Sequence, residues 1–125
     1  MSEILLVDDD LDLLKYFGVL LESEGHKVTL ASDSDEARER FLATRFDMVI
    51  TDIFLHGGDT LDAIEGYKSG RRKPKVIAMS GGGRHHNFGY LGEAKARGAD
   101  AIIEKPIENK LFLETVRQCL NELPS

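Results

Sequence analysis

Four short apolar runs in this chain each lead into polar residues of a kind that phosphate chemistry uses. Those polar residues are Asp8, Asp9, Asp52, Ser80 and Lys105. The carboxyl ends of parallel strands open onto one edge of a sheet, where open α/β sheets bind ligands. If the runs are parallel strands, the carboxylates, the hydroxyl and the ammonium therefore converge on one crevice.

The acidic members of this set predict a site for a divalent cation. If the first and third strands are neighbours, Asp52 lies ~5 Å from Asp8. Two carboxylates at that distance repel by roughly 3 kcal/mol at an effective dielectric of 20. A Mg²⁺ ion compensates such a cluster, because it binds one or two carboxylates, waters and phosphate oxygens. With Lys105 added, the charges of the ion and of Asp8, Asp9 and Asp52 balance to zero, so we expect Mg²⁺ (or Mn²⁺) here.

Asp52 is the candidate nucleophile for a phosphoryl group. Phosphoryl transfer depends on positioning and charge neutralisation more than on proton chemistry, and a carboxylate is already ionised at neutral pH. The metal would neutralise oxygens of the incoming group, and Lys105 would pair with another. The hydroxyl of Ser80 and the amide of Gly81 could hydrogen-bond the rest.

The elements that must position these residues alternate between strands and helices. Strands are expected at residues 3–7, 27–31, 47–51, 75–79 and 100–103. Helices are expected at residues 11–24, 34–44, 60–69, 89–97 and 108–123. This alternation predicts βαβ units, a parallel sheet and right-handed crossovers.

Local signals support the helices. Asp10 is expected to cap the first helix, Asp33 or Ser34 can cap the second, and Gly25 is a plausible stop. The apolar stripe of the first helix is Leu14, Phe17 and Leu21. The stripe of the last helix is Leu113, Val116, Leu120 and Leu123, while Phe112 and Cys119 are expected to serve helix packing.

Size and composition restrict the function. The chain has 125 residues, which suits one domain. Its formal net charge of −6 argues against non-specific binding to nucleic acid or membrane surfaces. No apolar run approaches the ~18 residues of a membrane span, and the start lacks a secretion signal. The single cysteine, Cys119, excludes an internal disulfide and favours a reducing, cytoplasmic compartment. The basic residues near the middle are expected to form a solvated loop; they are Lys68, Arg71, Arg72, Lys73 and Lys75.

The motifs together resemble those of bacterial two-component response-regulator receiver domains. The matching elements are Val7-Asp8-Asp9, Asp52, Ser80, and Lys105-Pro106 after Gly98-Ala99-Asp100. The resemblance covers the whole chain, so residues 1–125 are expected to form one CheY-like receiver domain. It implies a flavodoxin-like (βα)5 fold, with a doubly wound, five-stranded parallel sheet of strand order 2-1-3-4-5.

The resemblance also implies roles for the site residues. Asp8 and Asp9 would organise the Mg²⁺, with Asp52 and the backbone carbonyl of Phe54 as further ligands. A histidine kinase or a histidine phosphotransfer protein would phosphorylate Asp52. The domain would catalyse only its own phosphoryl transfer and dephosphorylation, so it would not be an enzyme in the usual sense. The Lys105–Pro106 peptide bond would be cis.

The switch of this family has two parts, and the chain departs from one of them. The hydroxyl that matches Ser80 moves toward the phosphoryl group, and an aromatic residue three positions before the lysine swings inward. Here that position is Ile102, so the aromatic half of the readout is missing. His56 replaces a usual proline, and the loop over residues 81–87 is longer and richer in glycine than usual.

The leading hypothesis is a stand-alone receiver that signals by changing its partner. Its output surface would be the face formed by the fourth helix, the fifth strand and the fifth helix. No DNA-binding element follows residue 125, so direct control of transcription by this chain is not expected, although a domain excised from a longer protein would show the same pattern. No direct nucleic-acid partner and no membrane partner are expected. A monomer or a phosphorylation-dependent dimer is expected.

Two alternatives belong to other classes. A pseudo-receiver would bind partners without being phosphorylated, and the missing aromatic residue favours it. A phosphatase with an aspartate nucleophile would usually have an acidic residue two positions after the nucleophile, where this chain has Phe54. A flavin carrier is weaker still, because a negative pocket repels the flavin phosphate.

Overall fold

Strands and helices alternate along the whole of the computed structural model, which describes residues 2–53, 55, 60–71, 73–80 and 88–121. The strands are β1 (Glu3–Val7), β2 (Lys27–Ala31), β3 (Met48–Asp52), β4 (Lys75–Ser80) and β5 (Ala101–Glu104). The helices are α1 (Leu11–Ser23), α2 (Ser34–Ala43), α3 (Thr60–Lys68), α4 (Phe88–Ala96) and α5 (Asn109–Asn121). Every one of these elements was predicted, and each end lies within two residues of the expected one.

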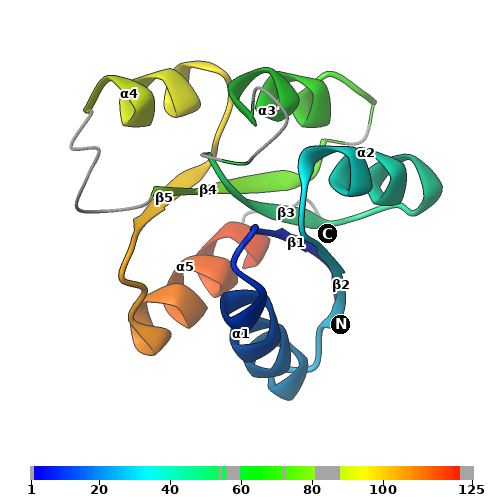
Figure 1. The fold of residues 1–125 in the computed structure, drawn as a ribbon, viewed down its shortest axis with the longest axis vertical. Coiled ribbons are helices and arrows are strands. Elements are labelled where there is room, and N and C mark those ends of the chain that lie inside the picture. Colours follow the sequence, from blue (N-terminus) through cyan, green and yellow to red (C-terminus); the bar gives the residue numbers. More distant parts are fainter. Residues whose placement is uncertain (1, 54, 56–59, 72, 81–87, 122–125) are drawn as a thin grey trace.

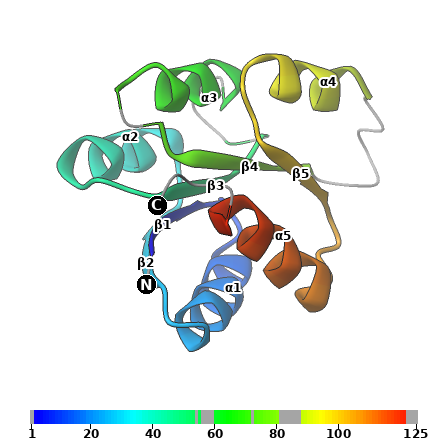
Figure 2. The same cartoon turned by 180° about the vertical axis from the view of Figure 1, so that it is seen from behind.

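The strands form one parallel sheet in the order β2-β1-β3-β4-β5, which confirms the predicted topology. Figures 1 and 2 show α1 and α5 covering one face of the sheet and α2, α3 and α4 covering the other. The fold is therefore the expected doubly wound, flavodoxin-like sheet. No helix in the described part of the chain is long and apolar enough to cross a bilayer.

The central strands are apolar on both faces, because helices cover both sides of a parallel sheet. In β1, Ile4 and Leu6 pack in the cluster under α1 and α5, and Leu5 and Val7 pack in the cluster under α2, α3 and α4. Phe112 of α5 is fully buried. Its ring centroid lies 4.7 Å from that of Phe17 in α1, which joins the two helices across the sheet face.

Side-chain caps begin the first two helices. The carboxylate of Asp10 accepts hydrogen bonds from the backbone N–H groups of Asp12 and Leu13, as expected for the cap of α1. Of the two candidates for α2, Asp33 is the cap and accepts from the N–H of Glu36 at 2.8 Å. Gly25 follows α1 with a φ of 91°, a left-handed conformation that glycine adopts without steric cost.

The predicted stripe of the last helix was partly wrong. The buried residues of α5 are Phe112, Val116 and Cys119, while Leu113 and Leu120 lie at the edge of the core. The buried face of α5 is therefore the one that carries Phe112, whose ring packs against that of Phe17 in α1. Leu123 lies outside the described residues.

The prediction of a solvated basic loop also fails for two of its members. Arg71 and Lys73 are exposed, but the ammonium of Lys68 lies 2.8 Å from Asp100 Oδ2 and that of Lys75 lies 3.9 Å from Asp100 Oδ1. The carboxylate of Asp100 also accepts from the N–H of Val76 at 2.8 Å. It therefore holds the end of α3 against the starts of β4 and β5. Arg72 lies outside the described residues.

Candidate functional site

The polar residues singled out in the sequence all follow or end strands at the carboxyl edge of the sheet. The register aligns Val7 of β1 with Thr51 of β3, so that Asp8 and Asp52 each lie one residue beyond the pair. Ser80 ends β4 beside Glu104, which is followed by Lys105. Because the strands are parallel, the topology brings these distant segments to one place, as predicted.

Three carboxylates gather at this edge. One carboxylate oxygen from each of Asp8, Asp9 and Asp52 lies within 4.8 Å of the other two. Asp8 is fully buried and Asp52 is 4% exposed, whereas Asp9 faces solvent. The observed separation agrees with the ~5 Å expected between neighbouring strands. Carboxylate oxygens are the ligands that Mg²⁺ prefers, so the donor set fits a hard divalent cation.

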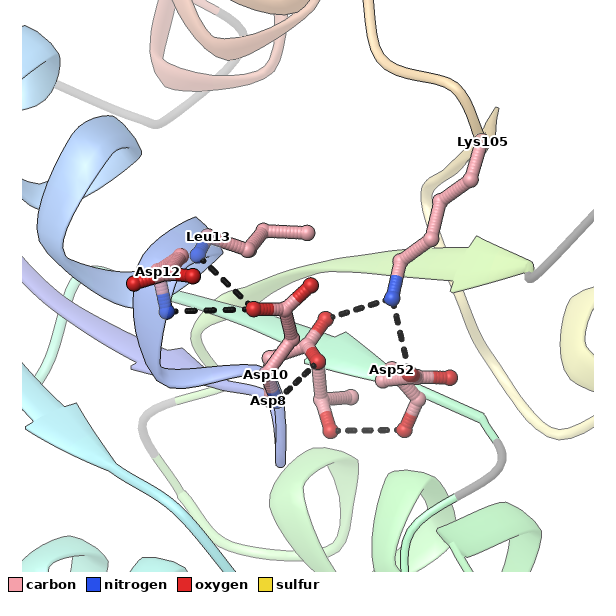
Figure 3. A network of polar contacts seen from close by, with 7 residues as sticks. Asp8, Asp10, Asp12, Leu13, Asp52 and Lys105 are labelled. Carbon is pink, nitrogen blue, oxygen red and sulfur yellow. Dashed lines mark hydrogen bonds and ion pairs between the residues drawn. The ribbon is translucent and has the colours of Figure 1, made fainter.

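The ammonium of Lys105 bridges the two buried carboxylates. Its Nζ lies 2.7 Å from Asp8 Oδ2 and 2.9 Å from Asp52 Oδ2 (Figure 3). The backbone also fixes this lysine, because its N–H donates to the carbonyl of Ser80 at 2.8 Å. The Lys105–Pro106 peptide bond is cis, as the family resemblance implies.

The electrostatics of the site follow from burial and pairing. Burial raises the pKa of Asp8, and the hydrogen bonds from Lys105 and from the N–H of Asp10 offset this rise only in part. Burial by itself would lower the pKa of Lys105, but the hydrogen bonds and charges of Asp8 and Asp52 outweigh it and raise that pKa. Lys105 is therefore a permanent cation at neutral pH.

The loop after β1 orients the acidic groups. Asp8 Oδ1 accepts from the N–H of Asp10 at 2.9 Å, and the Asp10 carboxylate in turn caps α1 (Figure 3). Consecutive aspartates thus have different roles: Asp8 and Asp9 contribute to the acidic cluster, and Asp10 starts the helix. The hydroxyl of Thr51 donates to the carbonyl of Asp52 at 3.1 Å.

The remaining predicted residues are placed as follows. Ser80 is 8% exposed at the carboxyl end of β4. Ile102 is half-buried in β5 and packs against the core cluster under α2, α3 and α4. Phe54, Gly81, His56 and the loop over 81–87 lie outside the described residues.

Sequence reasoning gave no structural role to two polar residues, Thr51 beside the site and Asp100 at the opposite edge of the sheet. Thr51 is a buried hydroxyl next to the candidate nucleophile, and its signal was a threonine inside an otherwise apolar run. Asp100 precedes β5 and anchors two lysines. Within the described residues, Asp8, Asp9 and Asp52 are the one group of His, Cys, Asp or Glu side chains spaced to hold a metal ion.

The fold and the site define a class: a doubly wound α/β domain with a cluster of carboxylates, spaced so that it could hold a metal ion, at the carboxyl edge of its sheet. The family model of the response regulator receiver domain matches residues 4–117. The chain therefore belongs to the response-regulator receiver family, whose members accept a phosphoryl group on an aspartate and bind Mg²⁺ at an acidic pocket.

Similar proteins agree with this family. The chain is 31% identical over 123 residues to the nitrogen assimilation regulatory protein NtrX of Azorhizobium caulinodans, which covers 97% of this chain and 26% of NtrX. It is 27% identical over 120 residues to the transcriptional regulatory protein CpxR of Escherichia coli, covering 96% of this chain and 50% of CpxR. The chain thus spans a quarter to a half of these relatives.

A solved structure matches over its full length. The receiver domain of NtrX from Brucella abortus superposes with a TM-score of 0.86 at 30% identity, covering 96% of this chain and 99% of that one. The similarity therefore extends over the complete receiver fold, including the strands that carry the acidic cluster.

Proposed function

We propose that Asp52 is the phosphoacceptor and that Asp8, Asp9 and Asp52 hold the Mg²⁺ of this receiver. The observation that supports this most is the bridging of two buried carboxylates by Lys105 at 2.7 and 2.9 Å, beside a third carboxylate within 4.8 Å. Burying like charges is costly unless it is compensated. A metal ion and a phosphoryl group are the partners that this combination of charges fits.

The chemistry is an in-line transfer from a phosphohistidine or an acyl phosphate. An oxygen of Asp52 attacks phosphorus, the bond from phosphorus to the donor nitrogen or oxygen breaks, and the leaving group keeps that electron pair. No general base is needed, because the attacking carboxylate is ionised. When bound, Mg²⁺ supplies neutralisation of the transferring oxygens.

The chain's own residues perform the remaining tasks. Lys105, which already contacts Asp52, would pair with one phosphoryl oxygen, a charge-assisted contact. The Ser80 hydroxyl and the Gly81 amide would take the others, and the Phe54 carbonyl would complete the metal ligands. Apart from this transfer to itself and the later hydrolysis, the domain would have no enzymatic activity.

Signalling would follow from a shift between two conformations. Ser80 would move toward the phosphoryl group, and Ile102 would respond only by repacking against the core it already contacts. The face of α4, β5 and α5 would then bind a downstream protein, as a monomer or a phosphorylation-dependent dimer. A histidine kinase or a phosphotransfer protein is the proposed donor, in the cytoplasm, with residues 1–125 acting as one receiver unit.

The test is phosphorylation by a small donor. The full chain is incubated with acetyl phosphate and Mg²⁺, and its intact mass is measured. The wild type should gain one phosphoryl group, which hydroxylamine removes because it is an acyl phosphate, and EDTA should prevent the gain.

Asp52→Asn should abolish the gain, and the exposed Asp12→Asn in α1 is the matched control that should keep it. A wild type without any gain would support the pseudo-receiver, and steady turnover of many phosphate esters would support the phosphatase. A gain that persists in Asp52→Asn would place the phosphoryl group on another residue.

A further inference from the structure

A groove of about 430 Å³ lies between α2 and α3, on the face of the sheet away from α1 and α5. The two helices lie side by side there in both views (Figures 1 and 2). Its volume falls within the range of roughly 300–1,000 Å³ that is typical of small-molecule sites. Its lining is mainly apolar, and the ring pair of Phe41 and Tyr67, with centroids 4.7 Å apart, forms part of the wall.

Two hydroxyl groups in this groove have no hydrogen-bond partner within the described part of the chain. They are Thr60 Oγ1 at the start of α3 and Ser34 Oγ at the start of α2. Thr60 is only 3% exposed, so water does not freely satisfy its hydroxyl. A buried polar group without a partner costs free energy. A ligand with hydrogen-bonding oxygens would remove this cost for both residues.

The charged residues of the groove indicate the sign of the charge that a ligand would carry. Asp62 pairs with Arg97 of α4, and Asp35 lies in the first turn of α2, where the helix dipole favours negative charge. Arg38 also lines the groove, and its guanidinium has no ion pair among the described residues. An anionic group on the ligand would therefore find its counter-charge at Arg38.

We propose that this groove binds a small carboxylic acid with a ring-sized apolar body. The carboxylate would face Arg38 and the hydroxyls of Ser34 and Thr60, and the apolar body would lie against Phe41 and Tyr67. Gly66 leaves space for it, since a Cβ added there would meet no atom within 4 Å.

Residues that precede and follow Asp52 in the sequence also line the groove. Thr51, which precedes Asp52, and Leu55 both line it. The hydroxyl of Thr51 already donates to the Asp52 carbonyl. A bound acid would therefore be placed to influence β3 where it presents Asp52. Binding itself does not require phosphorylation, so the Asp52→Asn variant should bind the acid as the wild type does.

The test uses two probes that differ in charge: 3-phenylpropionate and the uncharged 3-phenylpropanol. The full chain, labelled with ¹⁵N, is titrated with each, and amide chemical shifts are followed. The expected result is saturable shifts confined to α2, α3 and the end of β3. The acid should bind about tenfold more tightly than the alcohol, because a charge-assisted contact at an accessible rim is worth that order of affinity.

Variants separate this site from a non-specific effect. Arg38→Gln should remove the preference for the acid, whereas Arg40→Gln, an exposed arginine on the same helix outside the groove, should keep it. Gly66→Leu should abolish binding of both probes while the spectrum stays that of a folded protein, because leucine favours a helix over glycine. Absence of saturable shifts, equal effects of the two arginine variants, or unchanged binding in Gly66→Leu would each overturn the proposal.

Discussion

Replacement of Lys105 by methionine tests whether one ammonium holds the acidic crevice together. Methionine keeps the approximate length of the side chain and removes its charge. The two carboxylates that the ammonium now bridges would remain buried, with Asp8 fully buried and Asp52 4% exposed. Without a metal ion, both carboxylates would lose the cation that now bridges them.

The size of the effect follows from the distances. Carboxylate oxygens within 4.8 Å of one another repel by at least roughly 3.5 kcal/mol at an effective dielectric of 20. Breaking a buried ion pair by removing one partner typically costs about 3–5 kcal/mol. We therefore expect the free energy of unfolding of Lys105→Met to fall by about 3–5 kcal/mol at neutral pH in EDTA. Saturating Mg²⁺ should reduce this difference, because the ion replaces the missing positive charge.

The assay is urea denaturation with and without Mg²⁺, with the exposed Lys110→Met of α5 as the matched control that should change little. A second comparison adds Asp52→Asn to the variant. Since one of the repelling charges is then absent, the cost of Lys105→Met should fall by about 2–3 kcal/mol, the coupling expected of residues in contact. A Lys105→Met protein as stable as the wild type in EDTA would refute the idea that this lysine compensates the cluster.

Further predictions concern single positions and use the same denaturation assay. Because burial raises the pKa of Asp8 above 3.8, its contribution to stability is full below that pH and is lost as the pH rises through the raised pKa. The stability of the wild type relative to Asp8→Asn in EDTA should thus fall as the pH is raised from about pH 4, and a rise would contradict the burial argument. Asp10→Ala should cost about 1 kcal/mol by removing the cap of α1, and an unchanged midpoint would exclude that role. Gly66→Ala should stabilise the protein by up to about 1 kcal/mol, since the added Cβ meets no atom within 4 Å; destabilisation would show a clash at that position. Phe112→Ala should cost about 3–5 kcal/mol through the cavity it leaves in the core, and a cost below about 1 kcal/mol would mean that the core collapses around it.

The sequence predicted the strands well because their patterns are local. In β3, five consecutive buried residues end in Asp52, and such a run with a polar end is typical of a strand covered on both faces. The caps were equally local, since Asp10 and Asp33 bind N–H groups only two or three residues away. The positions of Asp8, Asp9 and Asp52 at the ends of expected parallel strands were enough to predict their gathering, which the structure confirms.

Predictions that depended on distant partners were less successful. The buried face of α5 was not predicted correctly, because the orientation of this helix depends on the contact between the rings of Phe112 and Phe17. These two residues are 95 positions apart in the sequence (112 − 17 = 95). Lys68 and Lys75 looked like members of a solvated loop until the fold placed Asp100 beside them. No feature of the sequence near Lys68 or Lys75 predicted that interaction.

By itself, then, the sequence determined the order of strands and helices, the helix caps and the identity of the residues at the strand ends, since each depends on side chains within a turn or two. Tertiary structure alone decided that Lys105 contacts both Asp8 and Asp52, and that α2 and α3 leave a groove with unpartnered hydroxyls between them. Contacts of this kind depend on how the helices pack against a twisted sheet. Their ångström-scale geometry is set by the packing of many side chains together, and no short stretch of sequence encodes it.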